Sequence, residues 1–469
     1  MEETFILQVD DALHIPKMKI NPRGFTREEL NKYISDKELT EYTVISIDKE
    51  IKKYRLQGNP DHKDLMDIEV YNYDTWLNAF LDNNINDFSL PVTVSDNEEY
   101  IAVLKDKFNQ YCKVVTKPAF VYEKGLVSDI RQNCDDILAV LQLLIDYKVD
   151  QAEELLKNFI DKFREDSFIV NELDNSYSFR GIAPFIELRS DGYENLYERM
   201  NNEKLTFFRA RTRKKGDNEN ISECQHMLHL PYEKKEKASA ARFSRVGVPC
   251  LYLGTTSYVC SRECDWIPDE EELFAASFIP NERGSKLKVL NLTISQALIN
   301  GIYNKHVGID NVKKGIQNSM LRIFPLVIAT SFRINEKDRK RKYEYLISQA
   351  LMKVISQSNI DGIAYLSMKG KNEFQYPHGV NLALPAFDIS ENKPYSQYCE
   401  MFDVTAPVLF NYQVGNGKRS YINAIYERID VNGQESFMSM VDVEGQYKFY
   451  GDIQYADFDN FLVSQNKAF

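Results

Sequence analysis

The sequence has little of what marks a membrane protein or a secreted one. Its N-terminus, MEETFILQVDD, lacks the basic start and the long apolar core of a signal peptide. Its longest apolar run, Ile137 to Ile145, is interrupted by Gln142, whereas a membrane-spanning helix needs about 20 apolar residues. We therefore expect a cytoplasmic chain that neither enters nor spans a bilayer.

Positive charge and a cysteine framework are also missing. The formal net charge is -12, which argues against nonspecific attraction to nucleic acid or to an anionic membrane. The seven cysteines are an odd number and are scattered without the spacing of a disulfide framework. We therefore expect free thiols in a reducing compartment, no membrane partner and no nucleic-acid partner.

What the chain does have is the composition of a globular protein and the length for more than one unit. Hydrophobic residues make up 43% and charged residues 27% of the 469 residues, and about 150 residues per domain suggest three units. We predict a region of unknown role over 1–110 and a helical hairpin region over 111–200, together forming one domain. A mixed unit follows over 201–388, and a β-rich extension over 389–469.

Two consecutive amphipathic patterns predict the helical hairpin. Apolar residues recur at three- and four-residue steps after Ser128, a candidate N-cap, as far as Ile145. A second stripe follows Asp150 and Glu153, which are spaced as a capping box, and it ends at Phe163. We expect the two helices to be the centre of a mainly helical N-terminal domain.

Beyond residue 200 the period changes to that of β-strands. The candidate strands are LTFFRAR (205–211), VPCLYL (248–253), LKVLNLT (287–293) and DGIAYLS (361–367). Helix-like segments separate several of them, notably YEYLISQALMKVISQS (343–358). We therefore predict the α+β class, with hairpins in the tail at GNGK and DVNGQ.

Four polar side chains end or border these strands: Arg209, Tyr252, Glu263 and Ser367. A cation, an aromatic hydroxyl, an acid and a small hydroxyl at strand-to-loop transitions are what a polar ligand pocket requires. We expect Glu263 to lie in a half-buried helix, where an ionised carboxylate is costly unless a partner or a catalytic task compensates it.

The order of these blocks resembles the RES domain, a family named for its Arg, Glu and Ser. The blocks are FFRAR, ARFSRVGVPCLYLGTTSYVCSRE, YEYLISQAL, and DGIAYLSMKG followed by HGVNLALPAF, and they cover about residues 203–388. The resemblance implies that 201–388 is a catalytic domain with a fold related to the ADP-ribosyltransferases. It also implies the activity of the studied members, bacterial toxins that cleave NAD at its nicotinamide–ribosyl bond.

By position, the resemblance implies these catalytic residues: Arg209, Tyr252, Glu263 and Ser367. Arg242 and Asn381 would join Arg209, Tyr252 and Ser367 in binding the substrate. One block departs from the family pattern, because AARFS stands where the family usually has a Gly-Arg-Trp-Asn-like stretch. A loop without that Gly cannot approach a phosphate as closely. The insertion over 214–239 is longer than usual, and a lid or a partner surface is its expected role.

The chemistry of NAD cleavage suits these side chains. Positive charge develops on the sugar as neutral nicotinamide leaves, so a fixed carboxylate such as Glu263 would stabilise the transition state. Arg209 would bind the pyrophosphate, Tyr252 would contact the nicotinamide ribose end, and Ser367 would position a ribose or amide group. We expect no metal and no cofactor, because NAD is the substrate. Whether water, phosphate or a protein side chain accepts the ADP-ribose stays open.

Structural interpretations compete with this one. Taken alone, Arg209 fits a salt-bridged edge residue, Tyr252 a core aromatic and Ser367 a turn or cap residue. Glu263 could pair with Arg262 or Arg245 on the surface, which would contribute little. Only the joint occurrence of the four side chains favours a site.

Other sites are weaker. A zinc site is suggested by five residues: Cys224, His226, His229, Cys260 and Cys264. Their spacing does not match that of usual zinc ligands, so packed thiols fit better. The basic run RKRKYEY (339–345) is short and is typical of a solvated helix start. The Arg-x4-His spacing of one RNase type is not found, so we do not expect that activity.

The sequence therefore predicts an NAD-degrading toxin or defence effector, either a glycohydrolase or a phosphorylase. It would be restrained by an antitoxin or by its own N-terminal domain, and its partners would be NAD and an antitoxin or activating protein. Two alternatives stay open: an ADP-ribosyltransferase that modifies a protein or nucleic acid, and a non-catalytic nucleotide-binding module. A homo-oligomer is also left open.

Overall fold

The computed structural model describes part of the chain, and every structural statement below concerns that part. It comprises residues 4–8, 19–25, 28, 32, 35, 43–48, 53–57, 88, 90–115, 125–180, 205–296, 298–299, 311–335, 341–369, 378–410, 440–443, 446–450, 453–465 and 467. The hairpins predicted at GNGK and DVNGQ lie outside these residues, as do the first two residues of the basic run 339–345.

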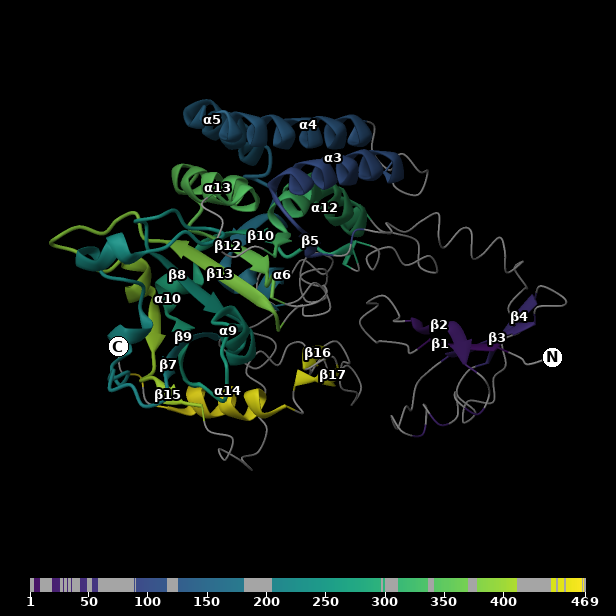
Figure 1. The fold of residues 1–469 in the computed structure, drawn as a ribbon. Helices are drawn as coiled ribbons and strands as arrows, with labels where there is room; N and C mark the ends of the chain where they lie inside the picture. Colours follow the sequence, from purple (N-terminus) through teal and green to yellow (C-terminus); the bar gives the residue numbers. More distant parts are fainter. Residues whose placement is uncertain are drawn as a thin grey trace.

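A nine-stranded sheet occupies the centre of the molecule (Figure 1). Its strands are β6 (Val170–Glu172), β7 (Phe207–Lys214), β8 (Cys250–Gly254), β9 (Glu271–Pro280), β10 (Lys288–Leu292), β12 (Gly362–Leu366), β13 (Val380–Pro385), β14 (Phe402–Val404) and β15 (Val408–Leu409). The order is β14-β9-β7-β8-β13-β12-β10-β6, with β15 beside β9. Among the described strands of this sheet, β10 and β12 pair in parallel and the others pair antiparallel. The four candidate strands all lie in this sheet, which confirms the α+β class.

Side chains along the central strands alternate between two apolar layers. Leu290 of β10 and Ile363 of β12 pack into the core under the helices, whereas Val289 and Ala364 pack into a second core on the opposite face. This is the period-two pattern of a strand that is buried on both sides. It explains why the candidate strands are nearly continuous apolar runs in the sequence.

Five helices cover one face of the sheet (Figure 1). They are α3 (Asn97–Val114), α4 (Leu126–Ile145), α5 (Val149–Asp161), α12 (Asn311–Thr330) and α13 (Leu346–Gln357). The helices α4 and α5 confirm the predicted hairpin, but its caps were predicted wrongly. The N-cap of α4 is Gly125 with a φ of 93°, a left-handed conformation that suits glycine, and Ser128 donates its hydroxyl to Gly125 O.

The predicted capping-box residue Glu153 has a different role. Its buried carboxylate accepts from Arg245 Nη2 at 2.8 Å and from Lys353 Nζ at 2.6 Å, so it links α5 to α13. Burial alone would raise the pKa of Glu153, but the hydrogen bonds from Lys353 and Arg245 outweigh it and lower that pKa. The capping prediction is wrong because the tertiary ion pairs draw the side chain away from the helix end.

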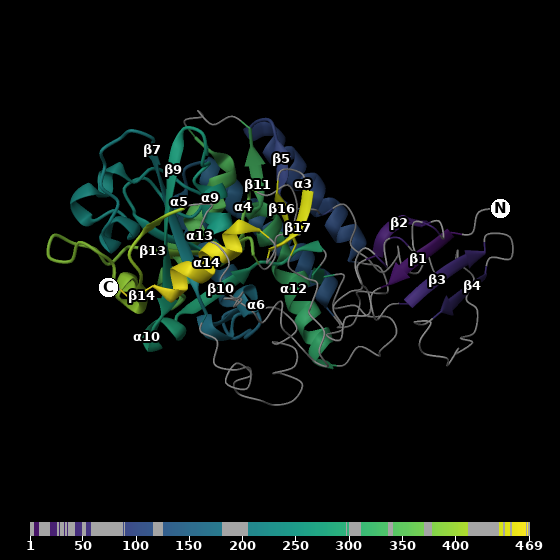
Figure 2. The same cartoon turned by 90° about the horizontal axis from the view of Figure 1, so that it is seen from below.

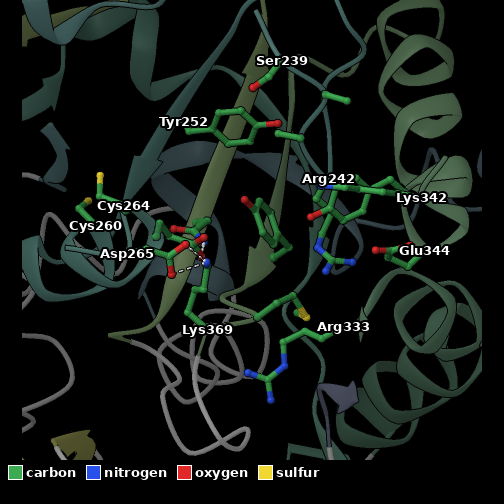
Figure 3. Close-up of a pocket in the computed structure, with 18 of the residues that line it drawn as sticks. Ser239, Arg242, Tyr252, Cys260, Cys264, Asp265, Arg333, Lys342, Glu344 and Lys369 are labelled. Carbon is green, nitrogen blue, oxygen red and sulfur yellow. Dashed lines mark hydrogen bonds and ion pairs between the residues drawn. The ribbon is translucent and has the colours of Figure 1, made fainter. Parts of the chain in front are cut away.

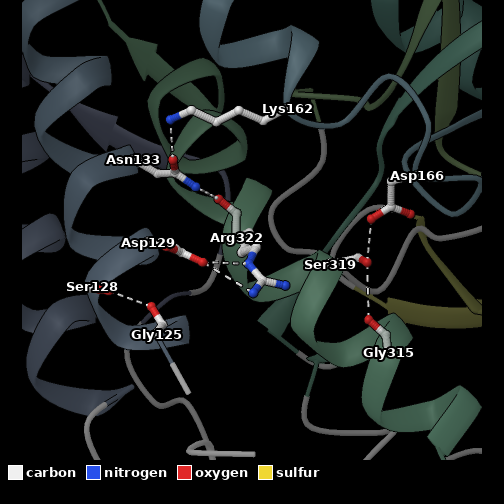
Figure 4. A network of polar contacts seen from close by, with 9 residues as sticks. All are labelled: Gly125, Ser128, Asp129, Asn133, Lys162, Asp166, Gly315, Ser319 and Arg322. Atoms are coloured by element: carbon white, nitrogen blue, oxygen red, sulfur yellow. Dashed lines mark hydrogen bonds and ion pairs between the residues drawn. The ribbon is translucent and has the colours of Figure 1, made fainter. Parts of the chain in front are cut away.

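Polar contacts also fix the helical hairpin to α12 (Figure 4). Arg322 of α12 donates to Asp129 at 3.2 Å, and its backbone oxygen accepts from Asn133 Nδ2 at 2.9 Å. Lys162 donates to Asn133 Oδ1 at 3.0 Å. Buried apolar residues of these helices and of the sheet also belong to one hydrophobic core. The domain boundaries stay predictions.

A short strand pair joins the N-terminal region to a distant segment. The strand β5 (Val92–Val94) pairs in parallel with β11 (Phe332–Ile334), with Thr93 opposite Arg333. The Phe332 ring packs edge-on against Tyr100 with centroids 4.8 Å apart. Tyr100 donates its hydroxyl to Ala329 O at 3.0 Å, which fixes the end of α12 ahead of β11.

The remaining elements lie at the periphery. The strands β1 (Thr4–Gln8), β2 (Lys19–Phe25), β3 (Thr43–Asp48) and β4 (Lys53–Gln57) form an antiparallel sheet in the order β2-β1-β3-β4. This sheet lies apart from the nine-stranded one in both views (Figures 1 and 2). Towards the C-terminus β16 (Met440–Val443) pairs with β17 (Gln446–Phe449), and α14 (Gln454–Ser464) follows.

The smaller helices complete the fold. The short α-helices are α6 (Tyr177–Arg180), α9 (Ser257–Glu263) and α10 (Glu282–Ser285), and the 3-10 helices are η1 (Leu173–Asn175), η2 (Cys224–Met227), η3 (Tyr232–Lys237), η4 (Tyr343–Tyr345) and η6 (Gln397–Met401). Both η2 and η3 belong to the insertion over 214–239. Within the described residues, no helix combines the length and apolar character that a membrane crossing requires.

Candidate active site

A pocket of about 830 Å³ opens where the sheet meets the β5–β11 pair, a volume in the range of small-molecule sites. Its walls come from β7, β8, β12, β13, the end of α9, β5, β11 and the loop before β8. It is lined by five of the residues singled out in the sequence: Arg209, Arg242, Tyr252, Glu263 and Asn381. The sixth, Ser367, contacts Glu263 directly.

Glu263 is the last residue of α9, and its side chain is exposed. The helix itself is half-buried, as expected, because its first five residues are buried, whereas Glu263 lies at its exposed C-terminal end. The helix dipole disfavours a carboxylate at a C-terminal end. The position of Glu263 is thus not explained by helix stability.

The sequence around α9 fixes where the helix ends. Thr256 Oγ1 accepts from Val259 N at 3.1 Å and caps the helix start. A Cβ on Gly254 would lie 2.5 Å from Val259 Cγ1, so only glycine allows β8 and α9 to approach this closely. Cys260 and Cys264 then donate their thiols to backbone oxygens of β7, at 3.1 and 3.5 Å.

The Glu263 carboxylate is oriented by two neutral donors. Ser367 Oγ lies 2.7 Å and Asn381 Nδ2 lies 2.6 Å from Glu263 Oε1. Both donors are buried, and they come from the end of β12 and the start of β13, which are neighbouring strands. The second oxygen, Oε2, has no hydrogen bond among the described residues, so it can accept one from a ligand.

Arg209 brings a half-buried cation to the pocket. Its Nη1 donates to Tyr252 O at 3.0 Å, whereas its buried Nε has no hydrogen bond among the described residues. Burial lowers the pKa of Arg209, yet a guanidinium that starts above 12 stays protonated at neutral pH. It forms no ion pair with a described acid, and a ligand anion would supply that missing charge.

Two tyrosines, Tyr252 and Tyr365, also line the pocket. Tyr252 donates its hydroxyl to Ser244 Oγ at 3.1 Å, and burial raises its pKa well above the usual value. The pKa of Tyr365 is also raised, first by burial and then by the charge of Glu263, which lies close to it. Tyr365 was not singled out in the sequence, although its place two residues before Ser367 put it on the same strand face.

Arg242 lines the pocket, but its hydrogen bonds run to the backbone. Its Nη1 donates to Thr330 O at 2.8 Å and its Nη2 to Phe332 O at 2.6 Å. Arg242 is therefore committed to the segment that leads into β11. Its predicted contact with the substrate stays a prediction.

The nearby Lys369 pairs with Asp265 and not with the Glu263 carboxylate. Lys369 Nζ lies 2.6 and 2.7 Å from the two oxygens of Asp265, which comes two residues after the end of α9 (Figure 3). The described hydrogen bonds of Glu263 come from Ser367 and Asn381 only, and neither is charged. No cation among the described residues pairs with this carboxylate.

The residues of the suggested zinc site have other contacts. His229 accepts from Ser396 N at 2.9 Å through Nε2, and its Nδ1 lies 2.7 Å from Leu230 O. The thiols of Cys260 and Cys264 bond to β7, and burial raises the pKa of Cys264 to about 11. No group of three or more potential ligands that could hold a metal ion is present among the described residues. All seven cysteines are free thiols.

Comparison with curated proteins finds similarity to "Putative toxin YopC" of Bacillus subtilis (strain 168). The two share 25% identical residues over 395 aligned residues, which span 77% of this chain and 85% of that protein. No family model matches the chain, and no solved structure matches it.

Proposed function

We propose that this chain is an enzyme of the RES-domain kind that cleaves the nicotinamide–ribosyl bond of NAD. The observation that carries the proposal is the Glu263 carboxylate at the pocket mouth, with Oε1 fixed by Ser367 and Asn381 and with Oε2 open. A fixed, unneutralised carboxylate beside a ligand pocket suits a reaction in which a sugar becomes cationic. An ADP-ribosyltransferase-like arrangement of the catalytic domain belongs to the same proposal.

In this mechanism Glu263 accepts a hydrogen bond from a ribose hydroxyl through Oε2. As the bond to nicotinamide lengthens, positive charge develops on the ribose, and the nearby carboxylate lowers the free energy of that state. Ser367 and Asn381 are positioning residues, since each donates to the oxygen that does not face the ligand. Because both donors are neutral, they orient the carboxylate without cancelling its charge.

Arg209 would bind the pyrophosphate. Its guanidinium is half-buried and pairs with no described acid, so a phosphate oxygen provides the charge-assisted hydrogen bond that its Nε lacks. Tyr252 has its hydroxyl directed at Ser244, which leaves the ring to pack against the nicotinamide ribose end. Tyr365, close to Glu263, would shield the same sugar from water.

A toxin role is part of the proposal. It is supported by the similarity to a protein whose name includes the word toxin, over most of both chains. An enzyme that consumes a shared cofactor requires restraint, either by an antitoxin protein or by the chain's own N-terminal region. We favour the second, because β5 of that region already forms part of the pocket wall.

The test is incubation of the purified full chain with NAD, followed by chromatography of the products. We expect nicotinamide and ADP-ribose, or a phosphorylated ADP-ribose when phosphate is present, and a rate about 100- to 1,000-fold lower for Glu263→Gln. Glu270→Gln, an exposed acid of the following loop that does not line the pocket, is the matched control and should keep the native rate.

Two outcomes would redirect the proposal. If NAD is lost only when a protein or nucleic acid is added and that macromolecule becomes labelled, the chain is a transferase that uses the same pocket. If the native chain and Glu263→Gln leave NAD intact to the same extent, cleavage is excluded and nucleotide binding alone remains.

A further inference from the structure

The side of the pocket across from α9 carries a cluster of cations that the proposed cleavage does not use. Arg242, Arg333 and Lys342 line this side, with Glu344 as the carboxylate among them (Figure 3). Figure 3 shows Arg242, Arg333 and Glu344 on one side, and Cys264, Asp265 and Lys369 on the other. Three cations around one described acid leave an excess of positive charge.

The strand β11 directs Arg333 towards the pocket. Successive side chains of a strand point to opposite faces, so Phe332 enters the core against Tyr100 while Arg333 faces the pocket. The pairing of Arg333 with Thr93 of β5 fixes the backbone at this point, and Thr93 itself lines the pocket. The N-terminal region therefore helps to build this side of the site.

No described residue accepts a hydrogen bond from the Arg333 guanidinium. Its Nε is buried without a hydrogen bond, and Arg333 forms no ion pair with a described acid. Burial, followed by the charge of Arg242, lowers the pKa of Arg333, so the two guanidinium groups lie close enough to repel. Two like charges held together in a partly buried place are stabilised by an anion between or beside them.

Arg242 and Lys342 differ in what they can offer to that anion. The Nη groups of Arg242 are engaged by the backbone oxygens of Thr330 and Phe332, so Arg242 fixes the start of β11 and adds positive potential. The ammonium of Lys342 lies 5.3 Å from the centre of the Tyr345 ring and forms no ion pair with a described residue. Lys342 can therefore reach a ligand.

We propose that Arg333 and Lys342 bind a phosphate group of the adenosine half of the substrate, across the pocket from Glu263. The proposal rests on the proposed function, because it places the scissile sugar at Glu263 and the remainder of the dinucleotide at the cations. A guanidinium beside an ammonium is the donor set that phosphate oxygens prefer. Either the pyrophosphate or a phosphate on the adenosine ribose supplies that chemistry.

Steady-state kinetics with three substrates separate these sources. With Arg333→Gln, we expect the KM to rise about tenfold and kcat to stay unchanged, since one charge-assisted contact is lost. A rise for both NAD and NADP indicates the pyrophosphate, and a rise for NADP alone indicates the ribose phosphate. Lys342→Gln should raise the same KM values, and Arg333→Lys should raise them less than Arg333→Gln does.

The controls make the result decisive. Nicotinamide mononucleotide lacks the adenosine half, so its KM should not change. Arg283→Gln removes an exposed arginine of α10 outside the pocket and should leave all three KM values unchanged. The proposal is overturned if Arg333→Gln changes KM less than twofold for NAD and NADP, raises it equally for the mononucleotide, or lowers kcat alone.

A binding measurement distinguishes this proposal from the proposed function. ADP is titrated calorimetrically into the full-length Glu263→Gln protein, with and without Arg333→Gln, at low and high salt. We expect a Kd about tenfold higher without Arg333 and weaker binding at high salt. If NAD is never cleaved but ADP binding depends on Arg333, the phosphate site stands alone. If ADP does not bind, or binds equally to both proteins, the pyrophosphate is not the group bound there. If adenosine 2′,5′-bisphosphate also fails to bind, or binds equally to both proteins, the phosphate site is excluded.

Discussion

The two sides of the pocket are built in different ways. The Glu263 side consists of adjacent strands of one sheet and the helix α9, so its residues are fixed by a continuous hydrogen-bonded framework. The Arg333 side depends on a three-residue strand pair that joins segments about 240 positions apart. If the proposed function is right, this difference predicts that catalysis and substrate binding can be disturbed separately, and four experiments test this.

The largest expected effect comes from removing the anchor of β11. Phe332→Ala deletes a fully buried ring that packs on Tyr100, and we expect the free energy of unfolding to fall by about 3–5 kcal/mol. Arg333 should lose its fixed position, so the KM for NAD rises while kcat is largely kept. Denaturant unfolding and steady-state kinetics measure both.

The control is Phe387→Ala, because Phe387 is 46% exposed and should change stability by less than about 0.5 kcal/mol. A fall in kcat for Phe332→Ala as large as that of Glu263→Gln would show that the two sides of the pocket are not separable.

The next effect is expected on the opposite side. Ser367→Ala or Asn381→Ala removes one donor to the Glu263 carboxylate. Because a hydrogen bond to a charged group is worth more than a neutral one, we expect the rate to fall about 10- to 100-fold. The loss should appear in kcat, with KM unchanged. Ser356→Ala, an exposed serine of α13, should retain the native rate. An increase in KM alone would contradict the positioning role.

A smaller effect on stability is expected at Glu153, which links α5 to α13. Glu153→Gln should lower the free energy of unfolding at neutral pH by about 1–2 kcal/mol, since both cationic partners are partly exposed. Glu154→Gln, exposed on the same helix, is the control.

The pKa shift of Glu153 determines in which direction its contribution to the free energy of unfolding changes with pH. Because the hydrogen bonds from Lys353 and Arg245 outweigh burial and lower the pKa of Glu153, its stabilisation is present above the unfolded pKa of about 4.3 and is lost as pH falls through the folded pKa. The difference between native and Glu153→Gln should therefore shrink in acid. A difference that grows in acid would refute the assignment.

The smallest effect is expected at the start of α9. Asp459 of α14 accepts from Ser257 N at 3.1 Å, and burial raises the pKa of Asp459 to about 7. A raised pKa means that its contribution is complete below the unfolded value and is lost as pH rises through 7. From about pH 6 to 8 the free energy of unfolding should fall by about 1 kcal/mol.

Asp459→Asn should remove this slope, and Asp457→Asn on the same helix should not. His378, which stacks on Tyr450 beside Asp459, does not interfere, because burial lowers the pKa of His378 to about 3. Thermal unfolding over this pH range measures the effect, and an unchanged slope in Asp459→Asn would assign it to another group.

The same contrast explains what the sequence could predict. The strands and the α4–α5 hairpin follow from periodicity, because the central strands are buried on both faces and each helix buries one apolar stripe. Arg209, Tyr252 and Glu263 meet at one pocket because β7 and β8 are paired strands and α9 follows β8 directly along the chain. Their catalytic and binding roles stay predictions.

What could not be predicted depends on contacts between distant segments. No local sequence pattern predicts that Thr93 pairs with Arg333, because strands of three residues are too short to show a period. Glu153 resembled a capping residue because the spacing is right, but its partners Arg245 and Lys353 lie 92 and 200 positions away, beyond any local rule. The exposure of Glu263 could not be predicted, because it depends on the helix α9 ending at this residue.

The place of β13 in the sheet has a consequence for the newly made chain. It is inserted between β8 and β12, both of which leave the ribosome earlier, and Asn381 follows Glu263 by 118 positions. A nascent polypeptide that stops short of β13 has a gap in its sheet and an acid without its amide donor. We therefore expect truncated translation products to be harmless to the producing cell, which ribosome-arrested lengths on either side of residue 380 would test.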